Sequence, residues 1–229
     1  MPASRYPQFC ALARAAEVLG ERWTLLIVRE LLLGPKRFSD LRARLDGPSP
    51  TVLTERLGRA ERVGLVRRVV LPPPAASTVY ELTEDGEALR PAVYELIRWG
   101  GRRMEPARKG DRAEPDWMRL ALAACARRGP TPRRTFRLRV TGRDAAEVTL
   151  RVTGGRQGTS VAVDDAPAET TIVADVPAIL GLVSGDLPAG VAIKKGAIMV
   201  SGDRAAVRDF PRLFEVQRSR QHPPKEGRS

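Results

Sequence analysis

Residues 49–71, SPTVLTERLGRAERVGLVRRVVL, contain the change of period that decides the fold. Ser49 is a favourable helix N-cap, and the proline after it loses no hydrogen bond because the first helical N–H is unpaired anyway. Leu53 and Leu57 then recur at helical spacing, and Gly64 is a natural helix end. After Gly64 the pattern becomes that of a strand. The segment therefore predicts a capped helix followed directly by a β-strand.

Upstream of this segment the pattern is helical. Helices are predicted near residues 10–19 and over residues 22–33, where apolar side chains share one face. Ser39 is a plausible N-cap for a short third helix, which an Asp-Gly-Pro sequence ends.

Downstream, strands over residues 65–71 and 78–82 are joined by a proline-rich turn. Thr83 is the expected cap of a long final helix with a broad apolar face. Pro91 lies early in this helix, where either tolerance or a kink is compatible with the pattern. The order of helices, capped helix and hairpin predicts a winged helix-turn-helix domain.

The basic residues are concentrated in the same region. The formal net charge of +12 indicates a polyanionic partner, either nucleic acid or an anionic membrane, unless a compositional bias toward arginine scatters the charge. Residues 36–68 hold nine basic and four acidic side chains, a balance of +5, whereas residues 1–35 carry +1 and residues 69–115 carry −1. This concentration favours binding to double-stranded DNA.

The first turns of such a helix enter the major groove, so Thr51, Thr54 and Arg56 are predicted to contact base edges or the groove wall. Ser49 and the helix start are suited to a phosphate, and the wing-base arginines to phosphate or the minor groove. A solvated helix face is the alternative. The predicted DNA-binding residues are Lys36, Arg37, Ser39, Ser49, Thr51, Thr54, Arg56, Arg67 and Arg68.

The second half of the chain predicts a small α+β domain, with an antiparallel sheet and helices on one side. Asp175 and Asp203 are expected helix caps, and Pro211 is expected to bend or interrupt the last helix. The predicted strands are residues 135–141, 147–153, 160–163, 171–174 and 197–201. The predicted division is a DNA-binding and dimerisation domain (1–104), a linker (105–116), an α+β domain (117–215) and a basic tail (216–229).

Few residues are suited to catalysis or metal binding. His222, in the tail, is the only histidine, and Cys10 and Cys125 are too far apart in sequence for a disulfide framework. We therefore expect no enzyme activity, no catalytic residue, no metal and no cofactor. The chain shows no secretory signal and no apolar run as long as a membrane span, so a cytoplasmic protein without a membrane partner is expected.

The first half resembles the HxlR family of winged-helix regulators, a similarity that spans roughly residues 6–103. The resemblance implies a homodimer, with the first and last helices of the domain packed across the two-fold axis, and two recognition helices reading an inverted repeat. Packing of the last helix within one chain is the alternative. The matching blocks are EVLGERWTLLI (17–27), LLLGPKRFSDL (31–41), SPTVLTERL (49–57), GLVRR (64–68), YELTEDG (80–86) and WG (99–100).

Several members of that family use a cysteine near the N-terminus as a redox or electrophile sensor, and Cys10 matches this position. The resemblance therefore implies a redox role for Cys10, which requires a thiolate favoured by nearby positive charge. Ala11 replaces the proline usual in the family. An inert apolar cysteine is the alternative.

The second half resembles the sterol-carrier-protein type of lipid-binding fold over about residues 115–215, on the stretches TIVADVPAIL (171–180) and AIMVSGD (197–203). The resemblance implies a hydrophobic tunnel for a fatty, isoprenoid or aromatic effector; simple core packing is the alternative. The residues expected to line this tunnel are Trp117, Ile179, Leu182, Val183, Phe210 and Phe214.

The sequence thus predicts a transcription regulator that responds to a ligand or to redox state. The alternative is a carrier or sensor of apolar ligands whose winged helix contacts another protein.

Overall fold

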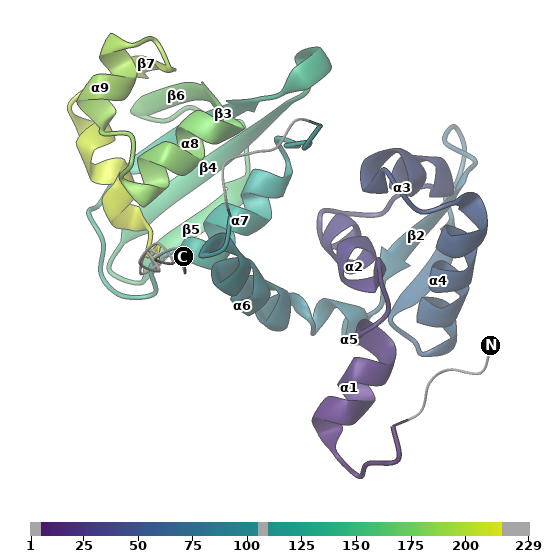
Figure 1. The fold of residues 1–229 in the computed structure, drawn as a ribbon. Coiled ribbons are helices and arrows are strands. Elements are labelled where there is room, and N and C mark those ends of the chain that lie inside the picture. Colours follow the sequence, from purple (N-terminus) through teal and green to yellow (C-terminus); the bar gives the residue numbers. More distant parts are fainter. Residues whose placement is uncertain (1–5, 105–109, 217–229) are drawn as a thin grey trace, which may run out of the picture. The chain divides into compact units, whose positions relative to one another are not determined.

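The computed structural model describes residues 6–104 and 110–216. Part of the predicted linker, and the predicted tail apart from its first residue, therefore lie outside the described residues. The chain divides into two compact units, and the boundary follows Val93, inside helix α6 (Arg90–Gly101) (Figure 1).

The first unit combines helices with a two-stranded hairpin. Leu41, Leu53 and Leu57 have no exposed surface, so the helices that carry them bury one face each in a common core. The hairpin strands pair antiparallel, with Arg68 opposite Tyr80. This arrangement is the predicted winged helix-turn-helix. Its elements are α1 (Ala11–Leu19), α2 (Thr24–Leu32), α3 (Phe38–Leu45), α4 (Pro50–Arg62), β1 (Val66–Val70), β2 (Thr78–Leu82) and α5 (Glu84–Glu87).

A glycine fixes the turn between α3 and α4. Gly47 has a φ of +157°, and a Cβ atom there would lie 2.5 Å from the ring of Trp23. Trp23 itself precedes α2 in a left-handed conformation, with a φ of 81°. Because residue 47 has no side chain, the indole ring packs directly on the turn and joins it to the start of α2.

The start of α3 differs from the prediction. The Asp40 carboxylate accepts a hydrogen bond of 3.1 Å from the backbone N–H of Arg37, and the helix begins at Phe38. Arg37, not Ser39, is therefore the N-cap residue. An aspartate in the third helical position satisfies the free N–H from within the helix, so no capping hydroxyl is needed.

The last helix of the winged domain is also divided. The Thr83 hydroxyl accepts a hydrogen bond of 3.1 Å from the Gly86 N–H, but the helix that it caps, α5, ends at Glu87. The chain then starts again as α6. Pro91 explains the break, because its ring excludes the carbonyl four residues earlier and is compatible only with the first turn of a new helix.

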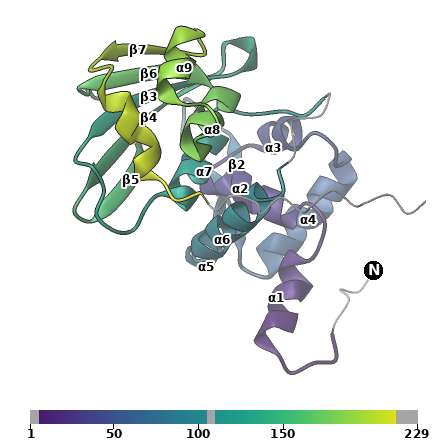
Figure 2. The same cartoon turned by 60° about the vertical axis from the view of Figure 1, so that its left-hand side comes forward.

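The second unit is a five-stranded sheet in the order β5-β4-β3-β6-β7, with helices α8 and α9 and the 3₁₀ helix η2 on one face (Figures 1 and 2). In its centre Leu138 lies opposite both Leu150 and Ile172, and none of the three is exposed. The elements after α6 are α7 (Trp117–Cys125), β3 (Thr135–Thr141), η1 (Arg143–Ala145), β4 (Glu147–Gly155), β5 (Gly158–Val163), β6 (Thr170–Asp175), α8 (Val176–Ser184), α9 (Ala189–Lys194), β7 (Ile198–Gly202) and η2 (Ala206–Leu213).

The sheet is mixed, which corrects the prediction of an antiparallel one. Strand β3 pairs antiparallel with β4 but parallel with β6. Residues 164–169 return the chain between β5 and β6, and Asp164 in this segment binds Arg151 of β4 at 2.5 Å. Alternation of apolar residues identifies each strand but carries no information about which strands become neighbours.

Of the two predicted helix caps in this unit, Asp175 forms as expected. The Asp175 carboxylate accepts a hydrogen bond of 2.8 Å from the Ala178 N–H at the start of α8. The N-cap residue of the 3₁₀ helix η2 is Ala205 and not Asp203, although Asp203 accepts hydrogen bonds from the Ala205 and Ala206 N–H groups. Pro211 lies inside η2. The short helix α9 is absent from the sequence prediction.

Candidate nucleic-acid interface

Helix α4 has a polar outer face in its first turns. Thr51, Thr54 and Glu55 are exposed, whereas Leu53 and Leu57 are fully buried. Two of the three residues predicted to contact bases therefore lie on an accessible surface. A major groove admits an α-helix, and a threonine offers both a hydroxyl for base edges and a methyl group for thymine.

The N-terminus of α4 forms as predicted. The Ser49 Oγ accepts a hydrogen bond of 3.3 Å from the Val52 N–H, and Pro50 is the first helical residue. Since the hydroxyl already caps the helix, an anion at this end would be held mainly by the remaining N–H groups of the first turn. The phosphate contact of Ser49 stays a prediction.

The segment before α3 is attached to the hairpin. The Lys36 N–H donates to the Tyr80 carbonyl at 3.0 Å, and the Tyr80 N–H donates to the Lys36 carbonyl at 2.8 Å. Lys36 is thus held beside strand β2 and is half-buried, while Arg37 and Ser39 are exposed. The chain enters the helix-turn-helix with its basic side chains next to the wing.

The two wing arginines are exposed and only loosely paired. The Arg67 side chain is 65% exposed and binds Glu81 at 2.7 Å, and the Arg68 side chain is 53% exposed and binds Glu61 at 2.9 Å. The hydrogen bond that Arg68 donates to Glu61 raises the pKa of Arg68. Exposed ion pairs of this kind contribute little to stability, so both guanidinium groups are available to exchange their carboxylate for a phosphate.

Arg56 does not lie on the outer face of α4 as predicted. Its side chain is 16% exposed, and it binds Glu21 at 3.0 Å. Arg59 binds the same carboxylate at 2.6 Å. The two arginines therefore attach α4 to the segment before α2. The sequence offered no sign of this contact because Glu21 lies more than thirty residues away along the chain.

A buried glutamate likewise attaches α3 to α2. Glu30 has no exposed surface and accepts hydrogen bonds from Arg29 at 2.7 Å and from Arg44 at 2.8 Å. A buried carboxylate needs such partners because its desolvation is unfavourable. Part of the basic surplus counted in the sequence is therefore internal.

Two further basic residues on the helices are exposed, Arg42 on α3 and Arg62 at the end of α4. Both belong to the basic surplus of residues 36–68 but are not among the predicted DNA contacts. Arg62 lies at helical spacing from the exposed Thr51 and Glu55 and the half-buried Gly58, a periodicity that was available in the sequence.

The two cysteines differ in environment. Cys10 is exposed and is the N-cap residue of α1. Arg14, a nearby positive charge on α1, binds Glu17 at 2.9 Å. Cys125, at the end of α7, is half-buried, and its burial raises the pKa of its thiol.

Five of the six residues predicted to line a lipid tunnel belong to a closed core, and Trp117 is the exception. Ile179, Leu182 and Phe210 have no exposed surface, whereas a residue lining an open tunnel would keep some. The ring of Phe210 stacks edge-on against Phe136 and Phe214, with centroids 5.2 Å apart in each pair. Val183 and Phe214 are nearly buried and Trp117 is half-buried. An apolar ligand enters this interior only if these side chains move apart.

A helix-turn-helix with an exposed second helix, basic side chains before its first helix and a basic wing defines a winged-helix DNA-binding protein. The HxlR-like helix-turn-helix family model matches residues 18–108, and the SCP-2 sterol transfer family model matches residues 116–215. Both families agree with the resemblances seen in the sequence.

The relatives are regulators of the same class. YvaP of Bacillus subtilis strain 168, an uncharacterised HTH-type transcriptional regulator, is 39% identical over 94 residues, which are 41% of this chain and 87% of YvaP. YodB of the same organism, also an HTH-type transcriptional regulator, is 38% identical over 92 residues, covering 40% of this chain and 82% of YodB. The crystal structure of reduced YodB aligns with a TM-score of 0.38 at 35% identity over 44% of this chain and 100% of that one.

An uncharacterised regulator of Mycobacterium tuberculosis, Rv3095, is 43% identical over 90 residues, and the match spans 39% of this chain but only 56% of that relative. On these matches the chain belongs to the HxlR family of helix-turn-helix transcriptional regulators and carries an SCP-2 domain after the winged helix. None of the helices within residues 6–104 and 110–216 has the length and apolar character needed to span a bilayer.

Proposed function

We propose that α4 is the recognition helix, and that the protein binds an inverted-repeat operator in double-stranded DNA as a homodimer. The observation that carries this proposal is the exposed face of α4 at Thr51 and Thr54, with basic side chains held around it. Tyr80 contacts two of these basic residues. Its backbone hydrogen-bonds the backbone of Lys36, and its ring lies 5.4 Å from the Arg68 guanidinium. Arg68 also binds Glu61 of α4.

Exposed apolar side chains support the homodimer. On α1 only Ala13 is buried, whereas the Leu12 side chain is 76% exposed and the preceding Phe9 is fully exposed. On α6, Leu96 and Trp99 are about half exposed. Apolar surface of this kind on helices is typical of an interface between protein chains. We infer that a second copy of the chain covers this apolar surface, because a two-fold-symmetric operator requires two copies of the protein.

The operator is identified by selecting duplexes from a random pool with the full-length protein. The proposal predicts enrichment of a pseudo-palindrome whose half-sites lie about one helical turn, roughly 10 base pairs, apart. Enrichment of a single half-site would contradict the homodimer, and absence of any enriched sequence would contradict specific binding.

Three variants then separate base contacts from phosphate contacts. Thr54→Ala should relax the preference at one position in each half-site, because a base contact carries sequence information. Arg67→Gln should weaken binding to all sequences alike. Arg204→Gln, an exposed arginine of the second unit, is the matched control and should leave both the preference and the affinity unchanged.

Cys10 is the proposed redox site. Its exposure at the start of α1, beside Phe9 and Leu12, places a thiol within the apolar surface assigned to the dimer. Alkylation of Cys10 should therefore weaken the dimer and, with it, operator binding, whereas Cys10→Ser protein treated with the same reagent should bind the operator normally. Equal loss of binding in both proteins would contradict a role for this cysteine.

A further inference from the structure

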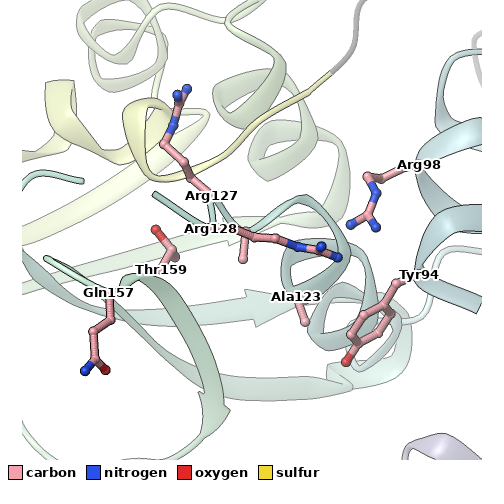
Figure 3. A pocket seen from close by; sticks show the side chains of 8 residues that line it. Tyr94, Arg98, Ala123, Arg127, Arg128, Gln157 and Thr159 are labelled. Atoms are coloured by element: carbon pink, nitrogen blue, oxygen red, sulfur yellow. The ribbon is translucent and has the colours of Figure 1, made fainter. Parts of the chain in front are cut away.

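A polar cavity of about 310 Å³ lies within the second unit, lined by side chains of α6, of α7 and its C-terminal end, and of the β4–β5 hairpin (Figure 3). Tyr94 and Arg98 come from α6, Ala123 from α7, and Arg128 from the segment that follows α7. Gln157 lies at the hairpin turn. The volume is at the lower end of the range of small-molecule sites, which is roughly 300–1,000 Å³.

Two arginines of this cavity converge on one carboxylate oxygen. Arg98 hydrogen-bonds Oε1 of Glu95, and Arg128 approaches the same atom to 3.8 Å. Figure 3 shows the Arg98 and Arg128 side chains pointing toward one another, while Arg127 points away from them. Arg98 also donates to the Ala124 carbonyl near the end of α7, which fixes its position. Two guanidinium groups thus share a single acid, and the place between them carries an excess of positive charge.

The ionisation of Glu95 indicates which ligands the space between Arg98 and Arg128 can bind. Hydrogen bonding from Arg98 lowers the pKa of Glu95, so the arginines stabilise the ionised carboxylate. The Glu95 side chain is nevertheless 65% exposed, so it can rotate into solvent without creating an empty buried space. A charge-assisted bond from a planar guanidinium favours carboxylates in general, so a carboxylate from outside can form the same contacts.

The neighbouring wall is less polar. The ring of Tyr94 and the methyl group of Ala123 line the cavity on the side of α6 and α7 (Figure 3). A ligand that places a carboxylate between the arginines therefore has an apolar surface beside it for a small hydrocarbon or aromatic group. Of the side chains predicted to bind a lipid directly, by contrast, all but the half-buried Trp117 are buried in the packed core of the domain.

We propose that this cavity binds a small organic carboxylate, whose acid group replaces Glu95 between Arg98 and Arg128 and whose apolar part faces Tyr94 and Ala123. Helix α6 begins in the first unit and lines the cavity with Tyr94 and Arg98, so an occupied cavity can act on operator binding through this helix. That regulatory step rests on the proposed function, but binding of the carboxylate does not.

The test is isothermal titration calorimetry of the full chain with benzoate, in the absence of DNA. Saturable one-to-one binding is expected. Arg128→Gln should weaken it about tenfold, which corresponds to the loss of one charge-assisted hydrogen bond. Glu95→Gln should strengthen it, because the internal competitor loses its charge. Arg208→Gln, an exposed arginine outside the cavity, is the matched control and should leave the affinity unchanged.

Absence of saturable binding would overturn the proposal, and so would benzoate affinities that are the same in wild type, Arg128→Gln and Glu95→Gln. Inorganic phosphate is titrated in parallel: binding of phosphate alone, with the same dependence on Arg128, would overturn the assignment to carboxylates. Because an exposed arginine can also contact DNA, the Arg128→Gln variant is titrated with the operator as well. Loss of operator affinity in a protein that does not bind benzoate would overturn the ligand site in favour of a phosphate contact.

Discussion

At the scale of single residues, Glu21 holds two arginines of α4 in ion pairs. It binds both Arg56 and Arg59, and the two arginine side chains are each 16% exposed. Arg56→Ala removes a charge-assisted hydrogen bond in a partly buried setting. We therefore expect the free energy of unfolding to fall by about 1–2 kcal/mol, measured by urea denaturation.

Thr54→Ala is the matched comparison on the outer face of the same helix, and it should change the free energy of unfolding by less than about 0.5 kcal/mol. If Arg56→Ala left stability unchanged and only DNA binding fell, Arg56 would be a direct DNA contact, and the ion pair with Glu21 would be incidental.

The cysteines provide a prediction about pH at the same scale. Only the thiolate reacts with iodoacetamide, and burial raises the pKa of Cys125, so less of this thiol is ionised at a given pH. Its alkylation rate should keep rising with pH beyond about 8.5, the ordinary pKa of a cysteine, where the rate of a free thiol levels off. Exposed Cys10 should be alkylated first. Peptide mass spectrometry over a pH series measures both rates, and faster labelling of Cys125 than of Cys10 at pH 7 would contradict this prediction.

At the scale of elements, the contact of the α3–α4 turn with Trp23 depends on a missing side chain. Gly47→Ala would place a Cβ atom 2.5 Å from the indole ring at a φ of +157°, so we expect the variant to be destabilised by more than about 1 kcal/mol. The thermal unfolding midpoint measures this.

Gly58, in the middle of α4, is the natural control because a Cβ atom there meets nothing closer than 3.7 Å. Gly58→Ala should stabilise the protein by about 0.5–1 kcal/mol, since alanine favours a helix. Opposite signs for the two substitutions are the expected result, and the same sign would contradict the assigned role of the turn.

Local signals account for the elements that the sequence predicted well. Ser49 with Pro50, Thr83 and Asp175 each cap a helix, because a cap depends on residues within one turn. Contacts between distant segments were not predictable: the pairing of Glu21 with Arg56, the parallel pair of β3 and β6, and the closed core around Phe210 all join residues far apart in sequence. Arg56 was misplaced for this reason, although its helix was located correctly.

At the scale of the whole molecule, the proposed dimer depends on apolar side chains that the single chain leaves exposed. Leu12→Glu places a charge on the surface of α1, where 76% exposure makes the change harmless to folding. Sedimentation velocity should show the wild type as a dimer and the variant as a monomer. Val163→Glu, on an exposed position of β5, is the matched control and should remain dimeric.

The central claim is that a basic winged helix, presented twice, recognises one DNA sequence. Fluorescence anisotropy with the selected operator and with a scrambled duplex of equal composition, titrated over a series of salt concentrations, tests it most directly. The logarithm of the affinity should fall linearly with the logarithm of salt concentration, and the operator should bind at least about 10³-fold more tightly. Equal affinity for both duplexes, or no binding at low salt, would contradict the claim.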